Sequence, residues 1–93
     1  MYKYEPKPTN QFKRDYRKML KQGKNRDLIE NIINTLAKGE PLPPKNRDHA
    51  LKGKWKGYRE CHIEPDWLLV YKIIHDKLIL LLVHTDSHSE LNF

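Results

Sequence analysis

The sequence predicts a single α+β domain spanning residues 1–93, with the element order β-α-α-β-β-β and two helices packed on an antiparallel sheet. Three observations predict this fold class. Apolar residues recur at helical spacing before residue 40, strand-length apolar segments follow residue 50, and 93 residues are too few to bury two separate cores.

Two amphipathic helices are expected in the first half of the chain. Thr9 or Asn10 can cap the first helix, which ends at Gly23, and Asn25 introduces the second, which ends at Gly39. Apolar residues line one side of each predicted helix: Phe12, Tyr16, Met19 and Leu20 in the first, and Leu28, Ile29, Ile32, Ile33 and Leu36 in the second. The short turn between them predicts an antiparallel helical hairpin.

Three strands are expected in the second half, at residues 58–64, 67–74 and 77–83. Their connections are short turns, which favours an antiparallel meander. The last two strands are almost continuous in Leu, Ile and Val, as expected for the middle of a sheet that the helices cover. Tyr2 and Tyr4 could add an edge strand ahead of the first helix.

The charge balance points to a polyanionic partner. Lysine and arginine outnumber aspartate and glutamate by 18 to 12, which gives a formal net charge of +6 and a pI of about 9.5. A field of this sign attracts nucleic acid. The alternative is that several of these lysines only solvate helix faces.

Cysteine usage and hydropathy favour a cytoplasmic protein with no membrane contact. Cys61 is the only cysteine, so no disulfide can form within the chain. The first ten residues lack the apolar segment of a signal peptide, and the longest apolar run, Leu78–Val83, has six residues against the roughly 20 that span a bilayer.

All five histidines lie in the second half, and His62 has the most informative neighbours. Strand alternation turns Cys61 toward the core and His62 away from it, and the following turn brings Asp66 and Trp67 close. A carboxylate orients an imidazole, and an exposed Trp gives a base a surface for stacking. The alternatives are an ordinary Asp in a turn and a Trp in the core. His75 lies in a predicted hairpin turn, where solvation alone explains it.

His49 precedes a basic, glycine-containing loop with an embedded aromatic residue. Lys52, Gly53 and Lys54 in this loop suit phosphate contact, because lysines meet the backbone charge and glycine lets the chain approach closely. A solvated surface loop explains the lysines equally well but explains the histidine poorly.

The end of the chain carries His84 and His88. A spacing of four would suit zinc on a helix, but the intervening Thr-Asp-Ser favours a loop and no HExxH pattern is present, so neither a metal site nor a cofactor is expected. RNA cleavage fits the histidines better. An imidazole or carboxylate can take the 2′-hydroxyl proton, an imidazolium can protonate the leaving 5′-oxygen, and lysine or arginine can stabilise the phosphorane.

Residues 48–71 match the pattern DHxLxGxWxxxRxxHxxPDWLLxY. This stretch, together with Ser87–Leu91, resembles the YafQ branch of the RelE/ParE toxin superfamily. The resemblance implies a RelE-like, microbial-RNase-like fold and a toxin of a type II toxin–antitoxin pair. Such a toxin would cut mRNA in the ribosomal A site without a metal, and a DinJ/RelB-like antitoxin would hold it inactive.

The resemblance also implies which residues act. The catalytic set would be His49, His62, Asp66 and His88. The RNA contacts expected from the loop, the strands and the motif together are Lys52, Lys54, Arg59, Trp67, His84 and Phe93.

The chain departs from the family pattern at His84, where the family carries an arginine that assists at the phosphate, and at Asp86. A titratable imidazole in that place predicts a slower or more pH-dependent reaction, and His84→Arg should then raise cleavage. Two alternatives stay open from the residues alone: a non-catalytic module that binds RNA or the ribosome, and a ParE-like toxin that inhibits DNA gyrase.

Overall fold

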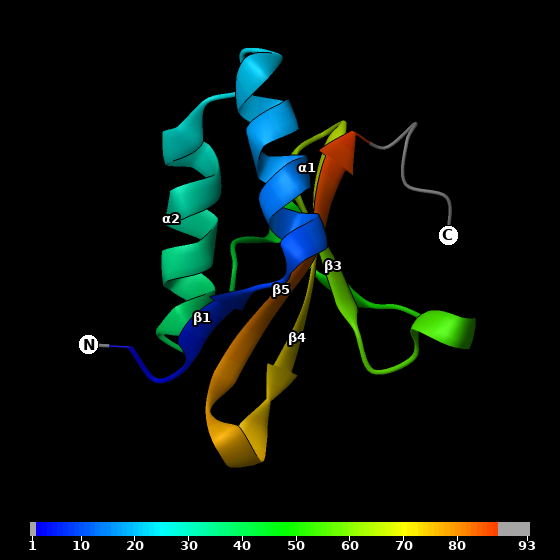
Figure 1. The fold of residues 1–93 in the computed structure, drawn as a ribbon. Coiled ribbons are helices and arrows are strands. Elements are labelled where there is room, and N and C mark those ends of the chain that lie inside the picture. Colours follow the sequence, from blue (N-terminus) through cyan, green and yellow to red (C-terminus); the bar gives the residue numbers. More distant parts are fainter. Residues whose placement is uncertain (1, 88–93) are drawn as a thin grey trace.

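The computed structural model describes residues 2–87 as two layers, a helical hairpin and a five-stranded sheet (Figure 1). The hairpin consists of α1 (Asn10–Lys21) and α2 (Arg26–Ala37). Across the sheet, the strands lie in the order β1 (Glu5–Pro8), β5 (Ile79–Ser87), β4 (Trp67–Ile74), β3 (Arg59–Glu64) and β2 (His49–Ala50). The α+β class is confirmed. No helix in this part of the chain is long and apolar enough to cross a membrane.

Both predicted helix starts are confirmed at the level of the capping hydrogen bond. The Thr9 hydroxyl accepts from the backbone N–H of Phe12 at 3.0 Å, and the Asn25 side chain accepts from the N–H of Asp27 at 2.9 Å. Each bond satisfies one of the N–H groups that a helix leaves unpaired at its start. The helices therefore begin where the sequence predicts.

The antiparallel meander is confirmed, but the sheet as a whole is mixed. Strands β3 (Arg59–Glu64), β4 (Trp67–Ile74) and β5 (Ile79–Ser87) pair antiparallel in chain order. Strand β1 (Glu5–Pro8) instead pairs parallel to β5, which corrects the prediction of a wholly antiparallel sheet. A parallel pair needs a long crossover, which the two helices and the meander between these strands supply.

The last strand is longer than predicted, and the predicted C-terminal loop at His84–Ser87 is wrong. Residues 84–87 pair with the first half of β4, with Ser87 opposite Trp67 and His84 opposite Val70. The sequence did not indicate this extension, because the apolar run ends at Val83 and polar side chains follow it. A partner strand of eight residues decides the length of β5.

The two faces of the sheet have different roles. Side chains at alternate positions, including Cys61, Leu69 and Leu80, join the helices in one buried core. Leu68 and Val70 alternate with Leu69 along β4, so they point to the opposite face, and they are also fully buried. That second face carries the polar cluster described below.

Helix α1 lies beside the part of β5 that extends beyond its pairing with β1. Strand β1 ends opposite Leu82, and from there the Thr9 backbone N–H donates to the Leu82 carbonyl at 2.9 Å while the Thr9 hydroxyl donates to the Val83 carbonyl at 3.1 Å. The helix then runs beside the polar end of β5 (Figure 1). This places side chains of α1 next to residues 84–86.

Candidate functional site

One row of paired residues crosses four strands and collects two of the predicted histidines. Residues that face each other in antiparallel strands project from the same side of the sheet. The row consists of His49, Glu60, Val70 and His84. Two positions further along β3, on the same face, lies His62, which is paired with Leu68. The fold therefore brings together three histidines that are far apart in sequence.

Each of these three imidazoles has its Nδ1 atom against a fixed oxygen. Nδ1 of His49 lies 2.8 Å from the Arg47 carbonyl, that of His62 lies 3.1 Å from the Pro65 carbonyl, and that of His84 lies 3.1 Å from Oδ2 of Asp15. Carbonyl and carboxylate oxygens only accept, so Nδ1 carries the proton in all three rings. The neutral form of each ring then has its lone pair on Nε2.

Glu60 is a site residue that the sequence analysis did not identify. Its side chain is only 7% exposed, and Oε1 lies 3.4 Å from Nε2 of His49. A buried carboxylate needs a partner, and this histidine supplies it. His49 itself lies on the two-residue strand β2 (His49–Ala50), within the segment predicted as loop. The contact between His49 and Glu60 follows from the register of β2 against β3, which the sequence alone does not show.

A partly buried polar network anchors the segment that carries His49. The Tyr71 hydroxyl donates to Oδ1 of Asp48 at 2.7 Å, and Nε of Arg59 donates to the same oxygen at 3.3 Å. Burial and the Asp48 hydrogen bond raise the pKa of the Tyr71 hydroxyl. Arg59 alternates with Glu60 on β3, so it projects to the opposite face, away from the histidine row.

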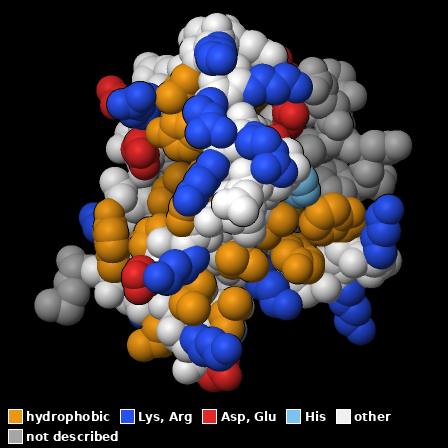
Figure 2. All heavy atoms as spheres, in the orientation of Figure 1, with side chains coloured by type: hydrophobic (Ala, Val, Ile, Leu, Met, Phe, Trp, Pro, Cys, Tyr) orange, Lys and Arg blue, Asp and Glu red, His pale blue; other side chains and the backbone are white. Residues whose placement is uncertain are grey.

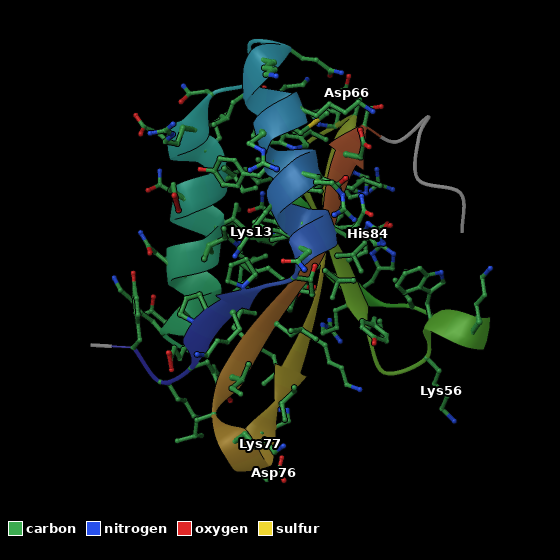
Figure 3. All side chains as sticks on the ribbon, viewed as in Figure 1. Lys13, Lys56, Asp66, Asp76, Lys77 and His84 are labelled. Carbon is green, nitrogen blue, oxygen red and sulfur yellow. The ribbon has the colours of Figure 1, made fainter. Side chains whose placement is uncertain are left out.

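The β3–β4 turn joins His62 to Asp66. The ring of His62 holds the Pro65 carbonyl, and Asn46 donates from Nδ2 to the His62 carbonyl at 2.7 Å. Asp66 is exposed, and its carboxylate lies 3.7 Å from Nζ of Lys24. Figure 3 shows Asp66 at this end of the sheet, further along β5 than His84. The turn therefore holds the His62 ring through the Pro65 carbonyl, while the neighbouring Asp66 carboxylate pairs with Lys24.

Trp67 does not offer a stacking surface, which corrects the RNA contact predicted for it. The side chain is fully buried, and Nε1 donates to the Thr85 hydroxyl at 2.9 Å in the core. Its position on β4 matches Leu69 and Tyr71, which face the helices. The half-buried Trp55 lies closer to the histidines, and its ring meets the His84 ring edge to face at 5.7 Å between centroids. The signal available in the sequence was a tryptophan between two lysines.

The loop after β2 places its cations in solvent. Lys52, Lys54 and Lys56 are exposed around the short 3-10 helix η2 (Gly53–Trp55). Lys56 points away from the body of the protein, while His84 lies beside α1 on the side of this loop (Figure 3). His88 and Phe93, also predicted as site residues, lie outside the described residues.

A second basic surface follows α1. Figure 2 shows lysine and arginine side chains gathered over this helix. They are exposed, and one of them, Lys18, lies 3.6 Å from Oδ2 of the buried Asp86. The members of this surface are Lys13, Arg14, Arg17, Lys18 and Lys21. The row of histidines therefore lies between two sets of cations.

His75 lies apart from the row, in the turn between β4 and β5. It is exposed, and its Nδ1 lies 3.4 Å from the Tyr4 hydroxyl. No group of three or more His, Cys, Asp or Glu side chains within residues 2–87 could hold a metal ion.

The chain matches known proteins over nearly its whole length. Residues 4–92 match the family model described as "Bacterial toxin of type II toxin-antitoxin system, YafQ". The mRNA interferase toxin YafQ of Escherichia coli K12 is 38% identical over 84 residues, which cover 89% of each chain. A metal-bound toxin from Helicobacter pylori superposes with a TM-score of 0.90 at 40% identity, covering 99% of this chain and 100% of that one. The DinJ–YafQ toxin–antitoxin complex of E. coli superposes with a TM-score of 0.87 at 34% identity, covering 98% and 99%. The chain therefore belongs to the YafQ family of toxins of bacterial type II toxin–antitoxin systems.

Proposed function

We propose that this toxin is an mRNA interferase, an endoribonuclease that cuts mRNA in the ribosomal A site. The carrying observation is the set of three imidazoles on one sheet face, each fixed through Nδ1 to an oxygen. Fixed imidazoles are the general acids and bases that phosphodiester transfer requires near neutral pH. The similar E. coli protein that bears the name mRNA interferase toxin supports the same reaction.

The reaction is transesterification through the 2′-hydroxyl. His62, whose Nδ1 binds a neutral carbonyl, takes the 2′-hydroxyl proton at Nε2 while the 2′-oxygen attacks phosphorus. His49 faces oxygen acceptors with both ring nitrogens, so its imidazolium donates to both and can deliver a proton to the leaving 5′-oxygen. The P–O5′ bond breaks, leaving a 2′,3′-cyclic phosphate and a free 5′-hydroxyl.

The remaining predicted residues assist at the phosphate and the bases. Lys52 and Lys54 neutralise the RNA backbone, and Trp55 replaces Trp67 as the stacking surface. Asp66 acts beside His62. His88 and Phe93 belong to the proposed site through the family motif alone.

Cleavage by this mechanism needs no metal, although a similar H. pylori toxin is described as metal-bound. Toxin that has been treated with a chelator and returned to a buffer with Mg²⁺ as its sole divalent ion should cleave at the original rate. A rate that depends on added Cu²⁺ or Zn²⁺ would contradict this part of the proposal.

We also propose an antitoxin partner of the DinJ type, since an E. coli relative is seen in complex with DinJ. A net charge of +6 favours an acidic partner. An acidic protein encoded next to this chain should abolish RNA cleavage at a one-to-one ratio. Full cleavage in the presence of excess partner would count against the assignment.

Three histidine variants test the enzyme itself on ribosomes programmed with a defined mRNA. His49→Gln and His62→Gln should each slow single-turnover cleavage by about 100-fold or more, because each removes a proton-transfer group. His75→Gln, a histidine outside the row, should stay within about twofold of the parent. A 2′-deoxy nucleotide at the cut position should block the reaction.

Other outcomes would favour the two remaining functions. Translation arrest that all three variants retain, without RNA cleavage, would indicate a ribosome-blocking module. Inhibition of DNA gyrase without RNA cleavage would indicate a ParE-like toxin.

A further inference from the structure

We infer that Asp15 of α1 is a positioning residue for the reaction: it holds His84 in the orientation that turns Nε2 away from the helix and toward the scissile phosphate. This inference rests on the proposed function for its chemistry. Its geometry stands on contacts within the described chain.

The carboxylate of Asp15 is buried, and both of its oxygens accept hydrogen bonds. Its side chain is 9% exposed, and it accepts from Nε2 of Gln11 at 2.8 Å and from the backbone N–H of Thr85 at 3.3 Å. The third contact is Nδ1 of His84 at 3.1 Å. The first two bonds fix the carboxylate, so the imidazole meets a rigid acceptor. A carboxylate held in this way sets both the tautomer and the direction of a histidine ring.

His84 is held on its other side by the loop that carries the lysines. The Trp55 ring packs edge to face against it, and only 25% of the His84 side chain is exposed. With Nδ1 bound to Asp15, the Nε2 edge of the ring is the part that remains for a ligand. The row register puts this ring on the same face as Glu60 and His49. A phosphate on that face would meet it.

Charged side chains lie on four elements around His84. Asp15 contacts it from α1, Asp86 shares its face on β5, and Glu60 lies in the same row on β3. The loop that brings Trp55 against the ring carries the exposed Lys54 and Lys56. Lys18 pairs with Asp86, and His49 pairs with Glu60, so Asp15 is the carboxylate in direct contact with His84. In its imidazolium form, the ring that Asp15 holds can donate from Nε2 to an oxygen of the phosphorane.

Asp15→Asn tests the inference because the amide keeps the size of the side chain and an oxygen for the Thr85 N–H, but it replaces the charged acceptor at Nδ1 of His84 by a neutral and weaker one. Single-turnover cleavage should fall at least tenfold at pH 7.5, with RNA binding changed by less than twofold. Glu30→Gln is the matched control, since Glu30 is also a helix carboxylate bound by a side chain, the Tyr16 hydroxyl, and should leave both the cleavage rate and RNA binding unchanged.

A double-mutant cycle with His84 distinguishes a positioning role of Asp15 from a purely structural one. In a His84→Ala background, Asp15→Asn should cost less than twofold, because the group through which it acts is already gone. Equal tenfold losses in both backgrounds would overturn the inference and assign Asp15 to the fold alone.

A measurement on the unmodified protein needs no variant and no activity. Nitrogen-15 shifts of the His84 ring should show the proton of the neutral form on Nδ1. A proton on Nε2 would overturn the inference whatever the kinetics show. If the parent toxin cleaves no RNA, the proposed function fails, while the tautomer still decides whether Asp15 orients His84.

Discussion

At the scale of single residues, the site depends on buried polar groups that sequence periodicity cannot pair. Asp48 precedes His49 directly and binds Tyr71 from the core side of the sheet. Glu60 holds the same histidine from the other face. The position of the His49 imidazole therefore depends on Asp48 next to it in the chain, on Glu60 of β3 and on Tyr71 of β4. A substitution at any of these three residues should alter that position.

Tyr71→Phe tests the Asp48 anchor. The variant loses one partly buried hydrogen bond, so the free energy of unfolding at pH 8 should fall by about 1 kcal/mol. Because the folded state raises the pKa of this hydroxyl, its contribution is present below about pH 10 and is lost as the pH rises further. The difference between parent and variant should therefore narrow at pH 10.5.

Urea unfolding at the two pH values measures this difference. Tyr2→Phe, at an exposed tyrosine, is the control and should stay within about 0.5 kcal/mol of the parent. A difference that is constant or widens with pH would show that Asp48 does not hold the neutral hydroxyl.

At the scale of elements, the polar end of β5 is held in the sheet by its core-facing threonine. The Thr85 hydroxyl accepts from Nε1 of Trp67 and donates to the Leu68 carbonyl, both at 2.9 Å. These two bonds connect residues 84–87 to β4 although the apolar run has ended. They also keep His84 in register with Val70.

Thr85→Val should lower the free energy of unfolding by about 1–3 kcal/mol, because it leaves the buried Trp67 N–H without an acceptor. Thr35→Val is the control, since the Thr35 hydroxyl only donates back to the Asn31 carbonyl within α2. Thermal or urea unfolding reports both. A Thr85→Val protein as stable as the control would mean that the apolar packing alone holds this strand.

The free edge of the sheet is blocked by prolines in β1. The backbone N–H groups of Glu5 and Thr9 donate to the carbonyls of Leu78, just before β5, and of Leu82 within it, so the intervening even positions face outward. Those positions are Pro6 and Pro8, which have no N–H to donate. An incoming strand therefore finds no donor there.

Replacing both prolines with valine should create a pairing edge. The Pro6→Val/Pro8→Val variant should show a higher weight-average mass in light scattering as its concentration rises, whereas Pro41→Val in an exposed loop should match the parent. An unchanged mass at every concentration would show that other features of β1 protect the edge.

At the scale of the whole molecule, the net charge of +6 supplies affinity for RNA while the loop lysines direct it to the site. Replacing Lys52, Lys54 and Lys56 together by Gln should reduce the slope of log affinity against log salt by about 2, since each contact with a single strand contributes about 0.7. Fluorescence anisotropy with a short RNA across a salt series measures the slope.

The same number of lysines removed elsewhere is the matched control. Gln at the exposed Lys38, Lys45 and Lys77 should leave the slope close to that of the parent. Equal slopes for both triple variants would mean that total charge, rather than the loop, determines RNA binding.

The sequence by itself determined the elements and most of the residue types of the site. Helix caps at Thr9 and Asn25, the two apolar stripes and the meander follow from local hydrogen bonding and periodicity, which act over a few residues. The motif likewise marked His49 and His62. Only the tertiary structure decided the parallel pairing of β1, the extension of β5 through His84, and the burial of Trp67 in place of an open stacking surface. Each of these depends on which partner lies across the sheet or under the helices, as does the pairing of Asp15 with His84 across 69 positions of sequence. Periodicity carries no information over that distance, because the contact is created by packing.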